Sequence, residues 1–540
     1  MANAFTKAAM QTTTTTENGA KAYASTGSNI LDQFGVAANY RGRDVQTVFA
    51  DQAQIWGENA ELALRFIFYL RMITRKTRVK DGYVTEDVQR GQGIRDEVYK
   101  RLLWVATNHE DTFYKNLWIL PIVGSWKDLW MLMVYDRELA TFCLKPEKIF
   151  EVMAQGMECE EHVDLIKKFM PRIKSFSKVK TDRAYFLNDL AKAFAKYMEW
   201  NCAEYNKFKS SGRAHEFQKV ICGGLYDNIN WNCIPGKALS LLTNSKFLEK
   251  HGLTESYTEW VKAQPTVKFN GYVHELAKDV NRSMSYDGKC GLSLAKRITI
   301  DKQFEQLIRT AMDGGNGAFK GNVMCCIDTS GSMGCIVDGK NTSAYEVCTA
   351  LGVYFSSMNT GAFNKAVMMF DDVSRFKTLS GGFCDMLTQI RGDDTAWGST
   401  NFMSIVHELC RIRRENPNIP LEEFPTTLLV VSDMQFNAYG DNSKTNYEAA
   451  KAVLSETFPQ EYVENMKFVW WNLRARANDN VPATMDNAGC YLFSGFDGSI
   501  LSLLLGQEEK VNEKGEVIKP SMEDAMISAL SQEILLQVAA

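Results

Sequence analysis

The sequence lacks the residue patterns that most zinc proteins, hydrolases and secreted disulfide proteins carry. Its 13 cysteines are scattered without a C-x-x-C pair, and its 6 histidines form no H-E-x-x-H motif. These absences argue against structural zinc and a disulfide scaffold, and they favour a reducing compartment, which we take to be the cytoplasm. No Walker-type glycine loop and no Cys/His or Ser/His constellation is visible, so we do not expect an enzyme.

Signals for export or membrane insertion are also missing. The threonine run at residues 12–16 has no apolar core behind it, so no secretory signal is predicted. The most apolar stretch, residues 117–134, is interrupted by Pro121, Lys127 and Asp128, which argues against a membrane span. Residues 1–40 are rich in Thr, Ala, Asn and Gly, and we expect a mobile leader there.

The remaining chain divides into two halves of different pattern and charge. Residues 41–320 are apolar at helical spacing with little Gly or Pro, which predicts stacked helical pairs of a HEAT-like repeat kind. Residues 1–320 carry 45 Lys and Arg against 37 Asp and Glu, whereas the remainder carries 16 against 28. This asymmetry suggests different partners for the two halves, with a polyanion possible for the first.

From residue 321 the apolar pattern alternates between strand and helix. Such alternation predicts a doubly wound parallel sheet covered by helices, over residues 321–506. A polar loop and a closing helix follow at residues 507–540. The expected strands cover residues 323–327, 366–370, 427–432, 467–472 and 490–493, and the expected helices cover residues 344–357, 402–414 and 447–457.

Three oxygen-bearing side chains follow the first of these strands at alternate positions: Asp328, Ser330 and Ser332. Side chains at the carboxyl end of such a strand face the crevice where open α/β sheets bind ligands. One carboxylate and two hydroxyls suit a small hard cation such as Mg²⁺. Asp and Ser also crowd ordinary turns, so this motif alone leaves a plain turn open.

Two distant positions strengthen the metal interpretation. Thr400 lies in a Gly-Ser-Thr loop before an apolar helix, and Asp433 ends a second buried strand. Strand–Asp-x-Ser-x-Ser, loop Thr and strand–Ser-Asp, in that order, resemble the metal-ion-dependent adhesion site (MIDAS) of a von Willebrand A domain. The resemblance implies that Asp328, Ser330, Ser332, Thr400 and Asp433 bind one divalent cation, Mg²⁺ or another.

An additional loop separates this motif from the next helix. Residues 334–341 intervene, and Ser343 with Glu346 predicts a capping box at the helix start. The loop carries Asp338, which could complete the cation's coordination from within the chain. The alternative is a solvent-exposed Asp-Gly turn.

Basic residues in the helical half form two series that could contact phosphate. The alternative is solvated helix faces, since acidic residues are interleaved in the first series. The candidate RNA contacts are Arg71, Arg75, Lys76, Arg78, Lys80, Arg95 and Arg101 in the first series, and Lys167, Lys168, Arg172 and Lys174 in the second.

The two-part layout resembles the Ro autoantigen family, in which a ring of helical repeats, the TROVE module, precedes a von Willebrand A domain. It is also similar to an uncharacterised plant, microbial and viral family with segments like residues 66–71 (FIFYLR), 90–95 (RGQGIR) and 124–129 (GSWKDL). The resemblance implies an RNA-binding scaffold that holds single-stranded ends or small structured RNAs. The competing hypothesis is an assembly protein that docks another protein through its metal site, without nucleic acid.

Overall fold

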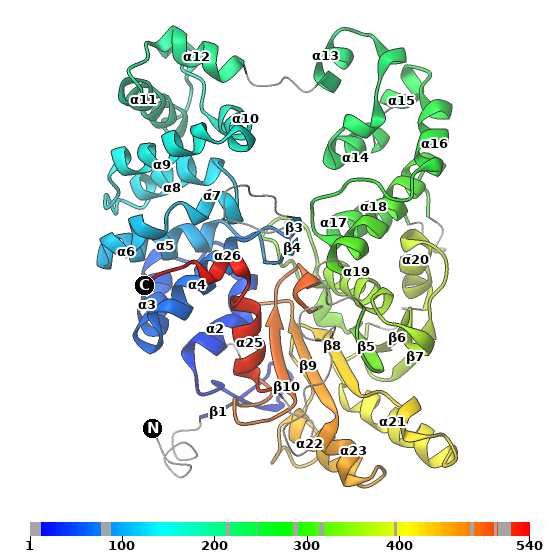
Figure 1. Ribbon diagram of the computed structural model, residues 1–540. Helices are drawn as coiled ribbons and strands as arrows, with labels where there is room; N and C mark the ends of the chain where they lie inside the picture. The colour runs from blue at the N-terminus through cyan, green and yellow to red at the C-terminus, as the bar shows by residue number, and fades with distance from the viewer. Residues whose placement is uncertain are drawn as a thin grey trace.

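The computed structural model combines a helical N-terminal half with a six-stranded mixed sheet in the C-terminal half, as the sequence predicts at this level (Figure 1). The structure describes residues 12–76, 88–211, 216–244, 246–284, 290–312, 318–393, 397–475, 480–501, 505 and 520–540. None of the helices among these residues is long and apolar enough to cross a membrane.

The helices of the N-terminal half form two arms (Figure 1). Helices α3, α4, α11 and α12 begin at a capping side chain; the Asp44 carboxylate, for example, accepts hydrogen bonds from the first amides of α3. The first arm contains α3 (Val45–Glu58), α4 (Ala60–Arg71), α5 (Asp96–Asn108), α6 (Glu110–Asn116), α7 (Ile119–Val123), α8 (Lys127–Glu138), α9 (Pro146–Glu158), α10 (Glu160–Phe169), α11 (Asp182–Tyr197) and α12 (Cys202–Ser210). The second contains α13 (Glu216–Cys222), α14 (Gly236–Asn244), α15 (Phe247–Lys250), α16 (Thr254–Ala263), α17 (Val273–Ser283) and α18 (Leu294–Met312).

The C-terminal sheet has the strand order β10-β9-β8-β5-β6-β7. Its strands are β5 (Val323–Asp328), β6 (Ala366–Phe370), β7 (Ser374–Thr378), β8 (Thr427–Ser432), β9 (Lys467–Asn472) and β10 (Cys490–Ser494). The helices of this half are α19 (Ala344–Ser357), α20 (Phe383–Asp393), α21 (Met403–Glu415), α22 (Asn446–Ser455) and α23 (Gln460–Asn465).

The expectation of an all-parallel sheet is wrong at one edge. β7 pairs antiparallel with β6, whereas the other neighbouring strands of this sheet pair in parallel. Only a three-residue turn separates β6 from β7, too short for a helical crossover. β7 is an edge strand and is only partly buried. Its sequence, SRFKT, lacks the apolar run of a buried parallel strand.

The predicted mobile leader is wrong for the described part of residues 1–40. Strands β1 (Thr13–Thr15) and β2 (Lys21–Tyr23) pair with each other, and α2 (Asn29–Val36) follows. The Thr16 hydroxyl donates to the backbone oxygen of Phe436, and Tyr23 forms a bridge with Val481. This segment is therefore held by contacts with residues more than 400 positions away, which its own composition does not reveal.

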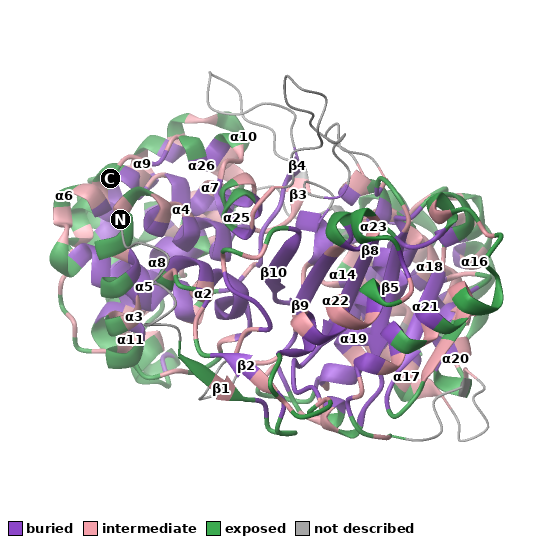
Figure 2. Cartoon of the chain, turned by 90° about the horizontal axis from the view of Figure 1, so that it is seen from below, coloured by how far each residue is buried: buried purple, intermediate pink, exposed green. Residues whose placement is uncertain are grey.

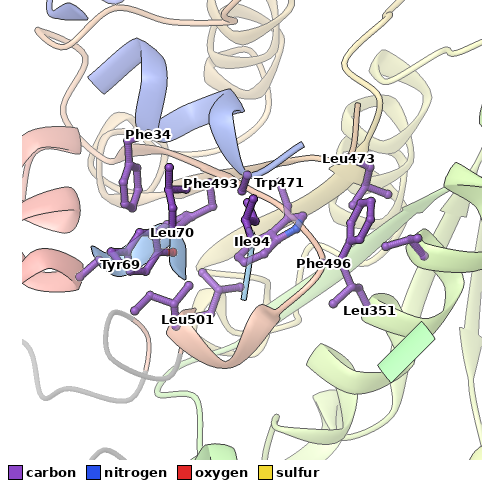
Figure 3. Packing of buried hydrophobic residues seen from close by; sticks show 14 of the residues in the cluster. Phe34, Tyr69, Leu70, Ile94, Leu351, Trp471, Leu473, Phe493, Phe496 and Leu501 are labelled. Atoms are coloured by element: carbon purple, nitrogen blue, oxygen red, sulfur yellow. The ribbon is translucent and has the colours of Figure 1, made fainter. Parts of the chain in front are cut away.

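The two halves share one hydrophobic core. Phe34 of α2 lies between the helical half and the sheet, with its ring 5.6 Å from both Tyr69 and Phe493. Phe493 in turn stacks on Trp471 at 5.6 Å, and Figure 3 shows these rings in one layer. The purple, buried residues in Figure 2 accordingly run from the helical half into the sheet. A second, smaller core lies in the other arm, around Trp231 and Tyr257.

The end of the chain returns to the helical half. The predicted closing helix is two helices, α25 (Met522–Leu530) and α26 (Glu533–Leu536), and both contact α4. Gln532 between them exchanges hydrogen bonds with the backbone of Arg90, at 2.7 Å in each direction. Of the polar loop predicted before this helix, residues 507–519 lie outside the described residues.

Candidate metal centre

The candidate site lies where two central strands of the sheet end. β5 ends at Asp328 and its neighbour β8 at Ser432, followed by Asp433. The chain leaves β5 toward β6 on one side and later returns to β8 on the other, so this is the switch point of the sheet. Open α/β sheets bind ligands at such points, because the loops diverge and leave a crevice.

Hydrogen bonds join all five residues predicted from the sequence. The Thr400 hydroxyl donates to the Ser330 hydroxyl at 3.0 Å, and the two serine hydroxyls lie 3.2 Å apart. The Ser332 hydroxyl donates to Asp433 Oδ1 at 3.3 Å, and the Ser330 amide donates to Asp328 Oδ1 at 2.9 Å. We call Asp328, Ser330, Ser332, Thr400 and Asp433 the oxygen cluster.

The two carboxylates of the oxygen cluster are buried together. Asp328 and Asp433 are 0% and 1% exposed. Ser332 is only partly buried, so solvent reaches the cluster at Ser332. Burial and the neighbouring Asp433 raise the pKa of Asp328 to about 7, and burial also raises the pKa of Asp433. Such shifts mean that an added positive charge would stabilise the ionised pair.

Loop contacts hold Thr400 and Ser332 in place. The Gly331 amide donates to the Gly398 oxygen at 2.9 Å, which ties the turn after β5 to the loop before α21. Asn18 from the N-terminal segment donates to the Gln435 oxygen at 2.6 Å and approaches the Thr400 hydroxyl at 3.4 Å. Asn18 was not predicted from the sequence, and no local signal distinguishes it.

Arg474 lies beside the oxygen cluster and was also missed. It follows β9, and its Nη1 is 3.7 Å from Asp433 Oδ2. Its side chain is one-third exposed, so this ion pair is partly screened by solvent. A basic residue shortly after a strand carries no sequence signal for such a role.

The predicted ligand role of Asp338 does not agree with its contacts. Asp338 Oδ1 accepts hydrogen bonds from the amides of Lys340, Asn341 and Thr342, and Oδ2 from the Thr342 hydroxyl. Although partial burial acts in the opposite direction, these hydrogen bonds hold the pKa of Asp338 below its usual range. Among the described residues, no hydrogen bond or ion pair joins Asp338 to the oxygen cluster. Asp338 caps its own turn, and its Oδ2 lies 3.9 Å from Lys278 Nζ.

The predicted capping box after this loop is confirmed. The Ser343 hydroxyl accepts from the Glu346 amide, and the Glu346 carboxylate accepts from the Ser343 amide. The start of α19 is therefore specified locally.

The first basic series is largely internal, which contradicts its role in RNA contact. Arg71 and Arg101 are fully buried. Arg71 donates twice to Asp128 Oδ2, at 2.9 and 2.6 Å, and Arg101 pairs with Glu97 at 3.0 Å. Arg75 is partly buried and donates to the Ile122 oxygen at 2.6 Å. Of this series Arg95 is exposed, while Arg78 and Lys80 and the side chain of Lys76 lie outside the described residues.

The three segments that carry the family resemblance meet at this buried pair. Asp128 also accepts from the Tyr99 hydroxyl at 2.6 Å and the Ser125 amide at 2.7 Å. A Cβ on Gly124 would lie 2.3 Å from Asp128 Oδ2, which explains the glycine of GSWKDL. Arg95, at the end of RGQGIR, lies 3.7 Å from the same carboxylate.

The second basic series is more accessible. Lys168, Arg172 and Lys174 are exposed on α10 and the segment after it. Lys167 is mostly covered, with its Nζ 4.7 Å from the centre of the Phe208 ring. The structure thus leaves the second series, but not Arg71 or Arg101, available to a polyanion.

Comparisons with known proteins cover both halves of the chain. Residues 322–534 match a domain of unknown function, DUF7788, and residues 16–164 match another, DUF2828. The chain is also similar to Uncharacterized protein L728 of Acanthamoeba polyphaga mimivirus. The two are 21% identical over 534 residues, covering 92% of this chain and 85% of the viral protein. The oxygen cluster falls within the first match and the Arg71–Asp128 pair within the second.

Proposed function

We propose that this protein is a docking scaffold whose C-terminal half binds one divalent cation, Mg²⁺ by preference, and recruits a partner protein through it. The supporting observation is the hydrogen-bonded oxygen cluster at the switch point of the sheet. In this proposal the C-terminal half is a von Willebrand A-type domain and the cluster is its MIDAS. The helical half is then a TROVE-like module that holds this domain on a rigid base.

The donor set fits a hard cation. Its members are two carboxylates and three hydroxyls, the oxygen ligands that Mg²⁺ accepts together with water. Among the described residues, no three Asp, Glu, His or Cys side chains gather into a metal-holding group. A cation here would therefore rely on hydroxyls and water for its other ligands. When bound, it would supply a Lewis-acidic position for an oxygen of the partner.

Calorimetric titration with Mg²⁺ tests this proposal. Wild-type protein stripped with EDTA is expected to bind one equivalent, and Asp433→Asn to bind none, because the hydroxyls cannot replace the lost charge. Asp441→Asn is the matched control, since Asp441 is an exposed aspartate in the loop that follows the same strand. Unchanged Mg²⁺ affinity in Asp433→Asn would contradict the proposal.

RNA binding is a second candidate function, and it is supported by the second basic series. Lys167 of this series lies with its Nζ 4.7 Å from the centre of the Phe208 ring. Phe208 lines an open hollow of about 450 Å³ together with Glu199, Trp200, Glu204, Lys207 and Ser211. The rings of Trp200 and Phe208 are 4.8 Å apart. Basic groups next to aromatic faces suit single-stranded nucleic acid, whose bases stack while its phosphates pair with Lys and Arg. Such binding would weaken steeply with added salt.

A further inference from the structure

Residues 16–19 lie along the loop that follows β8, and we call them the N-terminal strap. At one end of the strap the Thr16 hydroxyl donates to the backbone oxygen of Phe436 at 2.6 Å. At the other end Gly19 forms an antiparallel bridge with Asn437. The strap and this loop are therefore joined at both ends, although more than 400 positions separate them in the sequence.

The middle of the strap reaches the oxygen cluster through Gln435. The Glu17 amide donates to Gln435 Oε1 at 2.7 Å, and the Asn18 side chain donates to the Gln435 backbone oxygen at 2.6 Å. Gln435 is 4% exposed. Its backbone amide lies 3.4 Å from Asp433 Oδ1, and its Nε2 lies 3.4 Å from the Asp433 backbone oxygen. One buried side chain thus connects the strap with a carboxylate of the cluster.

Asn18 also contacts the cluster directly. Its Nδ2 lies 3.4 Å from the Thr400 hydroxyl, which itself donates to the Ser330 hydroxyl at 3.0 Å. A hydroxyl that donates one hydrogen bond and accepts another keeps one free lone pair. Asn18 and Ser330 together therefore fix the direction of the lone pair with which Thr400 would bind a cation.

Backbone strain in the loop after β8 gives the strap a role beyond packing. Met434, directly after Asp433, has φ +62°, a value that residues with a Cβ adopt rarely. Such conformations persist where surrounding contacts enforce them. The strap supplies contacts of this kind, because it bonds to Gln435 and Phe436, the next two residues. Without the strap this loop could relax and move the Asp433 carboxylate.

The strap itself is only lightly held. Glu17, Asn18 and Gly19 are exposed. Segments with exposed backbone and few buried apolar contacts open locally at a low cost in free energy. A cation that stabilises the strained loop would therefore also stabilise the docked strap, because coupling between two binding events is reciprocal.

We propose that the N-terminal strap and the cation bind cooperatively. The docked strap positions Asp433 and Thr400 for the cation, and the bound cation keeps the strap docked. Asn18 is then a positioning residue of the metal site, and release of the cation loosens the start of the chain. This inference rests on the proposed function, because it assigns the regulation of the same site.

Calorimetric titration of the full chain with Mg²⁺ measures the coupling in one direction. Asn18→Ala and Thr16→Val are each expected to weaken Mg²⁺ binding by about tenfold, the effect of one or two lost hydrogen bonds. Asn29→Ala is the matched control and should bind Mg²⁺ as the wild type does. Asn29 is an exposed asparagine just after the strap, and its side chain makes no hydrogen bond among the described residues.

Hydrogen exchange of the wild-type protein measures the coupling in the other direction, and it depends on no variant. Mg²⁺ is expected to slow exchange of the amides of residues 16–20 by about tenfold relative to EDTA, the same factor as in the titration. The amides of α16 in the second arm should exchange equally in both conditions. Asp433→Asn should show no slowing at the strap.

Three outcomes contradict the coupling. Unchanged Mg²⁺ affinity in both Asn18→Ala and Thr16→Val overturns it and leaves the metal site standing. Equal exchange of the strap in Mg²⁺ and in EDTA does the same, as does an equal slowing in α16, which would show only global stabilisation by a bound ligand. A wild-type protein that binds no Mg²⁺ overturns both this inference and the proposed function.

Discussion

Two of the places where the protein buries carboxylates differ in how the negative charge is neutralised. Asp128 lies 2.6 Å from the Arg71 guanidinium, also fully buried, and accepts further hydrogen bonds from Tyr99 and Ser125. Asp328 and Asp433 are equally buried but lie together, with three hydroxyls and the partly exposed Arg474 beside them. The first site carries its counter-charge within the core, whereas the second has two carboxylates and one partly exposed cation, Arg474, 3.7 Å from Asp433.

This difference separates a structural ion pair from the proposed metal site. A buried charge must be paired, because the interior solvates it poorly. The Arg71–Asp128 pair meets that requirement within the fold and connects α4 with α8. At the oxygen cluster the requirement is met by protonation or by an external cation. The following predictions test whether the two sites really differ in this way.

The largest expected effect is on folding stability at the first site. Asp128→Ala should lower the free energy of unfolding by about 3–5 kcal/mol, because it leaves Arg71 buried without its partner. The double variant Arg71→Met with Asp128→Leu should recover most of that loss, since apolar residues need no counter-charge. Urea denaturation measures both. The control Asp441→Ala should change stability by less than about 0.5 kcal/mol. A loss below about 1 kcal/mol in Asp128→Ala would remove the distinction between the sites.

The second effect is stabilisation by metal at the oxygen cluster. Mg²⁺ at about 100 times its Kd should raise the free energy of unfolding of the wild-type protein by about 2.7 kcal/mol. Asp328→Asn should show no such gain, whereas the double variant at Arg71 and Asp128 should keep all of it. Thermal or urea unfolding with Mg²⁺ and with EDTA provides the comparison. An equal gain in Asp328→Asn would show that the cation binds elsewhere.

The third effect is the part of the pH dependence of stability that the oxygen cluster contributes. Burial and Asp433 raise the pKa of Asp328 from 3.8 to about 7. Between these values the folded protein holds a proton that the unfolded chain releases, so stability in EDTA should fall as pH rises toward 7. In Mg²⁺ the opposite is expected for affinity, which should weaken as pH falls below about 7 because protons compete for the carboxylate. Asp328→Asn should lose the contribution of Asp328 to this stability change, and a stability change as large as in the wild type would assign it to other groups.

The smallest effect extends the comparison to the basic residues. Arg172→Ala with Lys174→Ala should weaken binding of labelled single-stranded oligouridine and reduce the salt slope by about 0.7 for each lost phosphate contact. Lys262→Ala, an exposed change on α16 of the other arm, is the control. Fluorescence anisotropy at several salt concentrations measures the slope. If oligouridine binds with the same slope to wild type and to the double variant, this basic series does not bind RNA.

Much of the C-terminal half could be predicted because its signals are local. Strands β6, β8 and β9 and helix α19 begin and end where the apolar runs and the capping box predict. The oxygen cluster was also predictable, since each member follows a buried strand or a Gly-Ser turn. Edge strand β7 was missed because a partly covered strand lacks a continuous apolar run.

The helical half was less predictable, because residue type does not reveal a buried partner. In the sequence, Arg71 and Arg101 look like exposed arginines that bind phosphate. In the structure Arg71 is paired with Asp128, 57 residues further along, and Arg101 is paired with Glu97. The composition of residues 12–23 predicts a mobile segment. The prediction fails because the residues that hold this segment, Gln435, Phe436 and Val481, lie more than 400 positions away in the sequence.

The sequence by itself determined the two-part organisation, most strand boundaries and the five oxygen ligands of the proposed metal site, because apolar periodicity and turn chemistry act over a few residues. The tertiary structure alone decided which charges are internal, that Asp338 caps its own turn, and that Arg474 lies beside the oxygen cluster. Those outcomes depend on contacts between distant segments, where burial and the presence of a counter-charge decide what a charged side chain does.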